Sequence, residues 1–158
     1  MAAPTPTARV TPTGIILPDG FSSKLTLAAS AAISLWETEV TPPGMEGGDR
    51  IDVTTMHNTT VMTFVPQALI DMTESSMTVG YDPNCYNQIL ALMNVETTIT
   101  ITWADGSTLA FYGYLRNFAP TGLVRGTMPT ATVTVAPTNY DPVNRVEAVP
   151  VLTSVAGT

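Results

Sequence analysis

Polar and apolar residues alternate over several stretches of the chain, and this alternation predicts β-strands. In Thr97–Trp103, threonines on one side oppose two isoleucines and a tryptophan on the other. Thr130–Ala136 alternates in the same way, and Glu74–Tyr81 places apolar residues opposite hydroxyl side chains. Shorter strands are expected at Ile33–Val40, Ile51–Thr55 and Val61–Val65.

Two local signals connect these strands. The Asp-Gly pair in Ala104–Ser107 is typical of a hairpin turn, with a return strand over Thr108–Arg116. A short α-helix is predicted at Pro83–Met93, because Asp82 is a good N-cap and proline suits the first helical position. Its apolar residues recur with helical spacing, at Tyr86, Ile89, Leu90 and Met93.

The elements together predict a mainly β fold, an antiparallel β-sandwich or small barrel with one short flanking helix. Both ends of the chain are rich in proline and lack periodicity, so they are expected to form extended arms. The predicted organisation is an N-terminal arm at residues 1–14, a β domain at residues 15–139 and a C-terminal arm at residues 140–158.

Composition supports the β assignment and narrows the possible partners. Of the 158 residues, 44% are hydrophobic and 12% are charged, and about one residue in six is a threonine, which favours strands over helices. The net charge is −7. Between Ile51 and Leu115 the chain contains acids but no lysine or arginine, so this region is expected to repel nucleic acid. No apolar run is long enough to cross a membrane.

Catalytic and metal-binding patterns are not found. His57 is the only histidine and Cys85 the only cysteine, so neither a zinc cluster nor an internal disulfide is expected. Nothing in the sequence places His57 next to Cys85 as a base, and packing is the preferred role for the thiol. No phosphate loop, calcium loop or aromatic-flanked carboxylate pair is present. We therefore expect a protein that is not an enzyme and needs no cofactor.

Four segments, in this order, resemble tail tube proteins, the major tail proteins of long-tailed bacteriophages. GGDRIDVTTMHN resembles a G-x-x-I-D-x-T segment of that family, and FVPQALIDMTESSMTVGYDP resembles the segment before its helix. ITITWADGSTLAFYGYLRNFAPTG is similar to its D-G-S hairpin, and MPTATVTVAPTN to its closing strand. The similarity covers Glu37 to Asn139, and it departs from the family in lacking a glycine after the closing strand.

The resemblance implies a structural virion protein. Such subunits form hexameric rings that stack into the phage tail tube, assembled in the host cytoplasm, and DNA passes down the lumen without specific binding. The implied partners are other copies of the chain, the tail terminator, the baseplate or tip and the tape measure protein. If each subunit gives four strands to a closed barrel, strand spacing and tilt yield a diameter of roughly 50 Å, wide enough for duplex DNA.

Two sets of residues are predicted to serve this role. Acids on polar strand faces are expected to line the lumen, and the candidates are Glu74, Asp52, Glu37 and Glu39. The glycine- and proline-rich loop Pro42–Arg50 is expected to contact the next ring, through Pro42, Pro43, Gly44, Met45, Glu46, Gly47, Gly48, Asp49 and Arg50.

Other classes of protein stay open at this point. One is a different β-rich virion component, such as a tail terminator, a baseplate protein or a capsid-decorating protein. Another is a β-sandwich module that binds a ligand such as a carbohydrate, although the chain has few aromatic residues for such a site. An enzyme would need a pocket with perturbed carboxylates.

Overall fold

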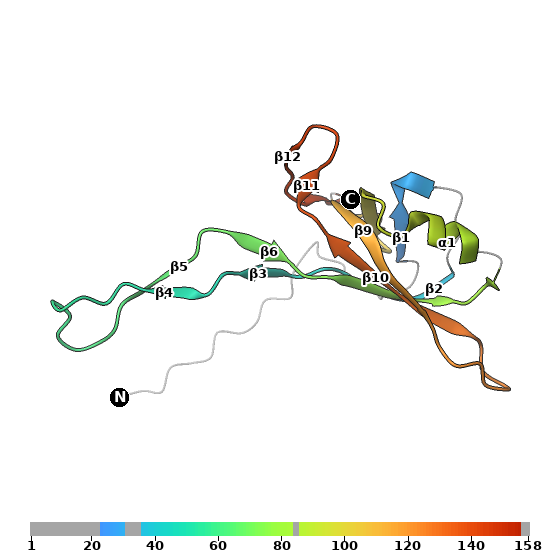
Figure 1. The fold of residues 1–158 in the computed structure, drawn as a ribbon, viewed down its shortest axis with the longest axis horizontal. Helices are drawn as coiled ribbons and strands as arrows, with labels where there is room; N and C mark the ends of the chain where they lie inside the picture. The colour runs from blue at the N-terminus through green and yellow to red at the C-terminus, as the bar shows by residue number, and fades with distance from the viewer. Residues whose placement is uncertain (1–22, 31–35, 84–85, 156–158) are drawn as a thin grey trace, which may run out of the picture.

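The computed structural model describes residues 23–30, 36–83 and 86–155, and these are mainly antiparallel β-structure, as predicted (Figure 1). The body contains β1 (Lys24–Leu27), β2 (Trp36–Thr41), β7 (Ser75–Gly80), β8 (Thr97–Thr102), β9 (Thr108–Pro120), β10 (Thr130–Pro137) and β13 (Val151–Thr153). Three strand pairs lie outside it: β3 (Met45–Gly47) with β6 (Ile70–Met72), β4 (Arg50–Asp52) with β5 (Phe64–Pro66), and β11 (Tyr140–Asp141) with β12 (Val146–Glu147). The helical elements are the 3-10 turn η1 (Ala28–Ser30) and the helix α1 (Tyr86–Leu92).

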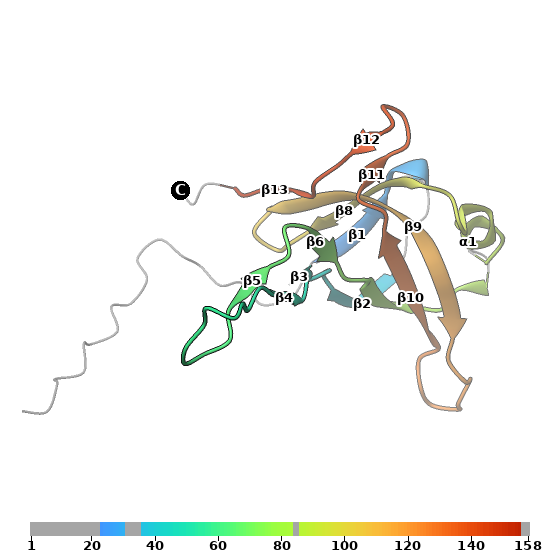
Figure 2. The ribbon, with the colours of Figure 1, turned by 60° about the vertical axis from the view of Figure 1, so that its left-hand side comes forward.

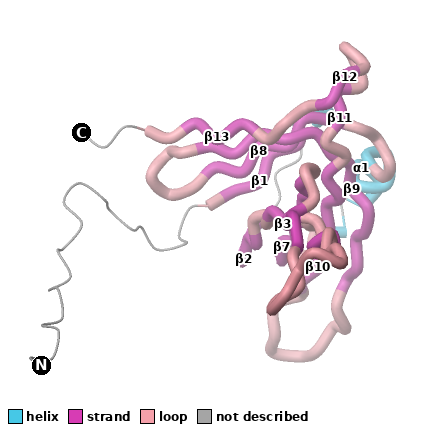
Figure 3. The backbone as a smooth tube through the Cα atoms, turned by 90° about the vertical axis from the view of Figure 1, so that its left-hand side faces the viewer, coloured by secondary structure: helices cyan, strands magenta, loops and turns pink. Residues whose placement is uncertain are grey.

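The strands of the body form one sheet in the order β1-β8-β9-β10-β7-β2, with β13 also paired to β9. The sheet folds over, so that β1 and β8 lie in one layer and β2, β7 and β10 in the other (Figure 3). The long strand β9 belongs to both layers, since residues 108–113 pair with β8 and residues 113–120 pair with β10. The edge strands β1 and β2 meet where the amide of Leu25 donates to a carboxylate oxygen of Glu37 at 3.4 Å.

The alternating pattern puts the apolar side chains between the two layers, where they form a single core. Threonines and tyrosines of the same strands are half-buried on the outer faces. The strand predictions for Glu74–Tyr81, Thr97–Trp103 and Thr130–Ala136 are therefore confirmed, including which side is buried. The core consists of Leu25, Leu27, Met72, Met77, Val79, Ile89, Ile99, Ile101, Leu109, Phe111, Leu115, Ala131, Val133 and Val135.

Strand β9 changes layers at a glycine. A Cβ atom added at Gly113 would lie 2.6 Å from the carbonyl oxygen of Ala136 and 3.0 Å from the side chain of Ile99. Two strands thus approach β9 more closely here than any side chain would allow. Three residues later the pairing with β10 shifts, leaving Arg116 without a cross-strand partner. Such bulges bend a strand, and together the two features carry β9 around the corner of the fold.

Turns and helix follow the sequence signals closely. In the predicted Asp-Gly turn, Gly106 has φ +86°, and the Asp105 carboxylate accepts the Ser107 amide at 2.8 Å. This amide and then the Ser107 hydroxyl lower the pKa of Asp105. Helix α1 lies within the predicted helix Pro83–Met93 and buries Ile89, while residues 84–85 lie outside the described part of the chain.

The segment predicted as a C-terminal arm is partly attached to the body. Strands β11 and β12 form a short hairpin, and Val151–Thr153 pairs with residues 108–110 of β9. The sequence lacks a strand signal here because β13 buries no side chain, with Val151 60% exposed, and is held by its backbone pairing. The N-terminal arm predicted at residues 1–14 lies outside the described residues.

Gly113→Ala is expected to lower the free energy of unfolding by about 1–3 kcal/mol, because the new methyl group has to displace the backbone of β10. Gly122→Ala is the matched control, since no atom lies within 4 Å of its added Cβ, and it should change stability by less than about 0.5 kcal/mol. Urea denaturation of both variants measures the difference. Equal stability of the two would show that β9 does not depend on this close approach.

Candidate assembly surface

A long two-stranded arm, residues 45–72, projects from the body (Figures 1 and 2). Its base is the pair β3–β6, where Met45 lies opposite Met72, and its outer part is the pair β4–β5, where Asp52 lies opposite Phe64. The arm is fixed to the core through Met72, which is buried. All the rest of the arm extends away from the two layers.

The outer end of the arm has an ordered local structure. The side-chain amide of Asn58 donates to the Val61 carbonyl at 3.0 Å and to the Thr63 hydroxyl at 2.6 Å. Asp52 accepts the Thr54 amide at 2.9 Å, and hydrogen bonds from the hydroxyl and then the amide of Thr54 lower the pKa of its carboxyl. These contacts hold the shape of the end loop without burying apolar surface.

Large apolar side chains cover the arm but remain in solvent. Met56 is fully exposed, at 102%, and Leu69 is 79% exposed. An isolated two-stranded hairpin is at best marginally stable in water, and exposed apolar side chains gathered on one projecting element make it a candidate surface for contact with another molecule. The exposed apolar residues of the arm are Met45, Ile51, Val53, Met56, Val61, Met62, Val65, Leu69 and Ile70.

The loop Pro42–Arg50, which the sequence predicts to contact the next ring, forms the root of this arm, and about half of its residues belong to strands. Residues Met45–Gly47 are β3, and Arg50 begins β4 with its guanidinium carbon 4.0 Å above the Phe64 ring. Pro42, Pro43 and Gly44 join the arm to β2, while Gly48 and Asp49 separate β3 from β4. The sequence gives no local signal for β3. Its segment is rich in glycine and proline, and its pairing partner β6 lies more than twenty residues further along the chain.

The four predicted lumen acids do not share one surface. Glu39 pairs with Thr78 on the outer face of the layer that contains β2, β7 and β10. Glu74 lies just before β7, exposed and ion-paired with Arg116. Glu37 pairs with the buried residue Val79 and therefore lies on the inner face of the sheet, at its edge. A bulge between Glu37 and Glu39 breaks the two-residue period that would have put both acids on the same face. Asp52 lies on the arm.

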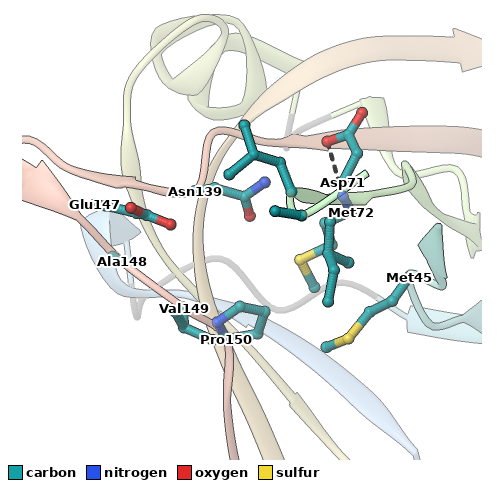
Figure 4. Close-up of a pocket in the computed structure, with 11 residues that line it drawn as sticks. Met45, Asp71, Met72, Asn139, Glu147, Ala148, Val149 and Pro150 are labelled. Carbon is teal, nitrogen blue, oxygen red and sulfur yellow. Dashed lines mark hydrogen bonds between the residues drawn. The ribbon is translucent and has the colours of Figure 1, made fainter. Parts of the chain in front are cut away.

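A pocket of about 230 Å³ lies where the base of the arm meets the segment after β12 (Figure 4). Its walls are mainly apolar, with Asp71 and Glu147 as the charged lining residues. The side-chain oxygen of Asn139, another lining residue, is buried without a hydrogen-bond partner. The apolar side chains that line it include those of Met45, Leu69, Ile70, Val149 and Pro150.

The chemistry of these surfaces favours contact with protein over binding of a small ligand. The pocket is smaller than the roughly 300–1,000 Å³ usual for small-molecule sites. Among the described residues no group of three or more His, Cys, Asp or Glu side chains could hold a metal ion. His57 lies exposed on the end loop of the arm, and Cys85 lies outside the described residues. No helix of the described chain could span a membrane.

Comparisons with known proteins leave the family open. No family model matches the chain, and no curated protein matches it. A cryo-EM structure of the anti-feeding prophage (AFP) baseplate aligns with a TM-score of 0.48 and 7% identity, covering 73% of this chain and 87% of that chain. A similarity of this size assigns neither a family nor a role to this chain.

Sequence reasoning missed the main feature of the site, the apolar surface of the arm. The strands Ile51–Thr55 and Val61–Val65 were expected inside the β domain, but in the structure β4 and β5 pair only with each other. A usable signal exists: the two predicted strands are short, and Met56 lies between them in a segment with no regular period. Apolar residues that fit neither a helix nor a strand face belong to a surface that the single chain does not bury.

Asp141 stabilises the turn between β11 and β12 beside the pocket, and this turn should open at low pH. Its carboxylate accepts the Val143 amide at 2.8 Å and the Asn144 side chain at 2.6 Å. The Asn144 side chain contributes most to lowering the pKa of Asp141 below its usual value of 3.8. A lowered folded-state pKa means that the carboxylate stabilises the turn above the unfolded pKa and stops doing so as pH falls through the folded value.

We therefore expect the Val143 amide resonance to keep its position down to about pH 4 and to shift below it, following the Asp141 carboxyl in an NMR titration. In the Asp141→Asn variant one acceptor oxygen remains and the titration is removed, so the shift should disappear. An Asp141 carboxyl that titrates at or above its usual value would contradict the assignment.

Proposed function

We propose that the protein is a structural virion subunit without catalytic activity that assembles with copies of itself into the tube of a phage tail. The observation that carries this proposal is the arm, because it presents apolar side chains away from the body that remain exposed among the described residues. A surface of this kind is stable in water only when another molecule buries it. In a stack of rings, an arm that leaves the body reaches the neighbouring ring.

The layer formed by β2, β7, β10 and the second half of β9 suits a barrel shared between subunits. It has four strands, and beyond Leu115 the outer edge of β9 has no strand paired to it among the described residues. Unpaired edges with little charge invite pairing with another chain, and closure into a ring removes them. A hexamer of four-strand layers gives a backbone diameter of roughly 50 Å, which leaves room for duplex DNA.

The outer face of this layer then becomes the lumen wall. It carries threonines and serine, such as Thr78, Thr132 and Ser76, with Glu39 and Glu74 as its acids. Hydroxyls and carboxylates offer no cation to phosphate, and the Arg116 guanidinium of β9 is already ion-paired with Glu74, so DNA is expected to slide past with little release of counterions. The resemblance to tail tube proteins implies further partners within the tail, which are the terminator, the baseplate or tip and the tape measure protein.

Assembly of the purified full chain tests the proposal. Negative-stain microscopy and sedimentation velocity should show rings or tubes at high protein concentration. The double variant Met56→Ser, Val61→Ser should fold normally and stay monomeric, since it removes two apolar contacts from the end of the arm. Leu90→Ser is the control, because Leu90 is also a large apolar side chain that is mostly exposed, at 60%, but lies on α1 and not on the arm, and this variant should assemble.

A wild-type chain that stays monomeric at every concentration would overturn the proposal. Closed trimers that never form tubes would favour a capsid-decorating protein instead. If the arm variant assembles as well as the wild type, the arm is not the contact, and a different surface has to account for any rings observed.

The lumen assignment has its own test. In virions that carry Glu39→Lys and Glu74→Lys, phosphates that pass through the tube would meet fixed cations and bind them. DNA ejection should therefore slow, most strongly at low salt where screening is weakest. Tubes should still form, because Glu39 is exposed and the ion pair that Glu74→Lys removes lies at the surface, where such a pair contributes little to stability. Ejection at the wild-type rate at every ionic strength would place these acids outside the lumen.

A further inference from the structure

Two surfaces at different ends of the subunit are both apolar and carry opposite charges. One is the pocket between the base of the arm and the segment after β12. The other is the end of the β9–β10 hairpin, residues 121–129, which we call the tip. We propose that the tip of one copy docks into the pocket of the next copy, in a head-to-tail contact. The inference rests on the proposed self-assembly and names the surfaces that carry it.

The tip is apolar and basic, and it is rigid at its root. Thr121 bonds to Thr130 through its amide at 2.9 Å and through its hydroxyl at 2.6 Å. At the far end, the Thr127 amide donates to the Val124 carbonyl at 3.2 Å, and Gly126 takes φ +85° to close the turn. Leu123, Val124 and Met128 are 75%, 66% and 58% exposed. The tip thus presents bare apolar side chains on a defined turn.

Arg125 stands at the centre of this turn and makes no ion pair among the described residues. A guanidinium next to exposed apolar side chains is a common composition at the centre of protein interfaces. The charge also has an obvious complement on the chain, since the net charge is −7 and the described arm carries more acids than bases.

The pocket supplies acids where the tip supplies the cation. Asp71 and Glu147 line it from opposite walls, one from β6 and one from β12 (Figure 4). Glu46 lies directly opposite Asp71 in the β3–β6 pair. Like charges in directly opposed positions destabilise a strand pair, so this arrangement has an unfavourable interaction that an incoming cation would relieve.

The volume and the lining of the pocket fit a turn. About 230 Å³ accommodates one or two side chains such as Val124, and the lining residues Leu69, Ile70 and Val149 are themselves largely exposed in the free subunit. Docking would cover apolar surface on both partners and place Arg125 among the acids. It would also bring the N–H donors of Arg125 toward the wall that contains the side-chain oxygen of Asn139, which has no hydrogen-bond partner.

The contact has to form between two copies. Both Figure 1 and Figure 2 place the tip far from β6 and β12, so the tip does not reach the pocket of its own chain. Two different patches that join successive copies make a heterologous interface, which closes into a ring when the rotation between copies allows it. Head-to-tail docking therefore provides the kind of contact that a ring requires.

Charge reversal tests the pairing on the full chain. We expect Arg125→Glu to raise the concentration needed for assembly by about tenfold or more, the size of effect that loss of one close charge pair at an interface produces. Lys24→Glu makes the same charge change on β1, outside both surfaces, and should assemble like the wild type. Combining Arg125→Glu with Glu147→Arg should restore assembly, and circular dichroism should show native folding of each variant.

Cross-linking tests the geometry directly. In a Cys85→Ser background, V124C together with V149C should give a ladder of covalent oligomers on mild oxidation of the assembled protein, because each chain would link to the next. V124C together with L90C is the control and should give none. If the wild type assembles but Arg125→Glu assembles equally well, or no ladder forms, the tip-to-pocket contact is wrong while self-assembly stands. A wild type that never assembles overturns both.

Discussion

The close approach of β10 to Gly113 is the constraint on which the rest of the fold depends. At this residue β9 pairs with Thr97 of β8 on one side and with Pro137 of β10 on the other. Before it, β9 belongs to the layer with β1; after it, β9 belongs to the layer with β2. Because one strand is common to both layers, it holds them together on one side of the core, and the contact between β1 and β2 joins them at the other edges. The tip and the arm both extend from this one fixed arrangement.

Much of this fold could be predicted from the sequence, for a clear physical reason. Strands that bury one face against a core carry the strict two-residue period, and β7, β8 and β10 were predicted with the correct buried side. The Asp-Gly turn and α1 were found because turn and cap chemistry is local. The bulges at Arg116 and between Glu37 and Glu39 were not found, since a bulge shifts the period by one residue without a characteristic residue type.

The candidate site was predicted less completely, because its apolar residues stay exposed and so leave no burial pattern in the sequence. The loop Pro42–Arg50 was chosen for its glycines and prolines, and it does form the root of the arm. The apolar residues beyond it, such as Met56 and Leu69, were not chosen, because a sequence pattern reports burial within one chain. Strand β13 was missed on the same ground, as its pairing with β9 uses backbone groups and leaves the side chains exposed.

The arm, the tip and the edge of β9 beyond Leu115, to which no described strand pairs, are all consistent with the unusual composition. A strand-rich chain with 12% charged residues has little charge with which to block unwanted edge pairing. The edge strands carry only a few charges, Lys24 on β1 and Glu37 and Glu39 on β2, and the outer faces of β8 and β10 carry threonines. Such a surface is a hazard for a protein that remains alone and an advantage for one whose edges and apolar ends are covered by its own copies. In the contact that we propose, Arg125 on the tip and Asp71 and Glu147 in the pocket would make one of these apolar surfaces directional, because opposite charges favour head-to-tail over random association.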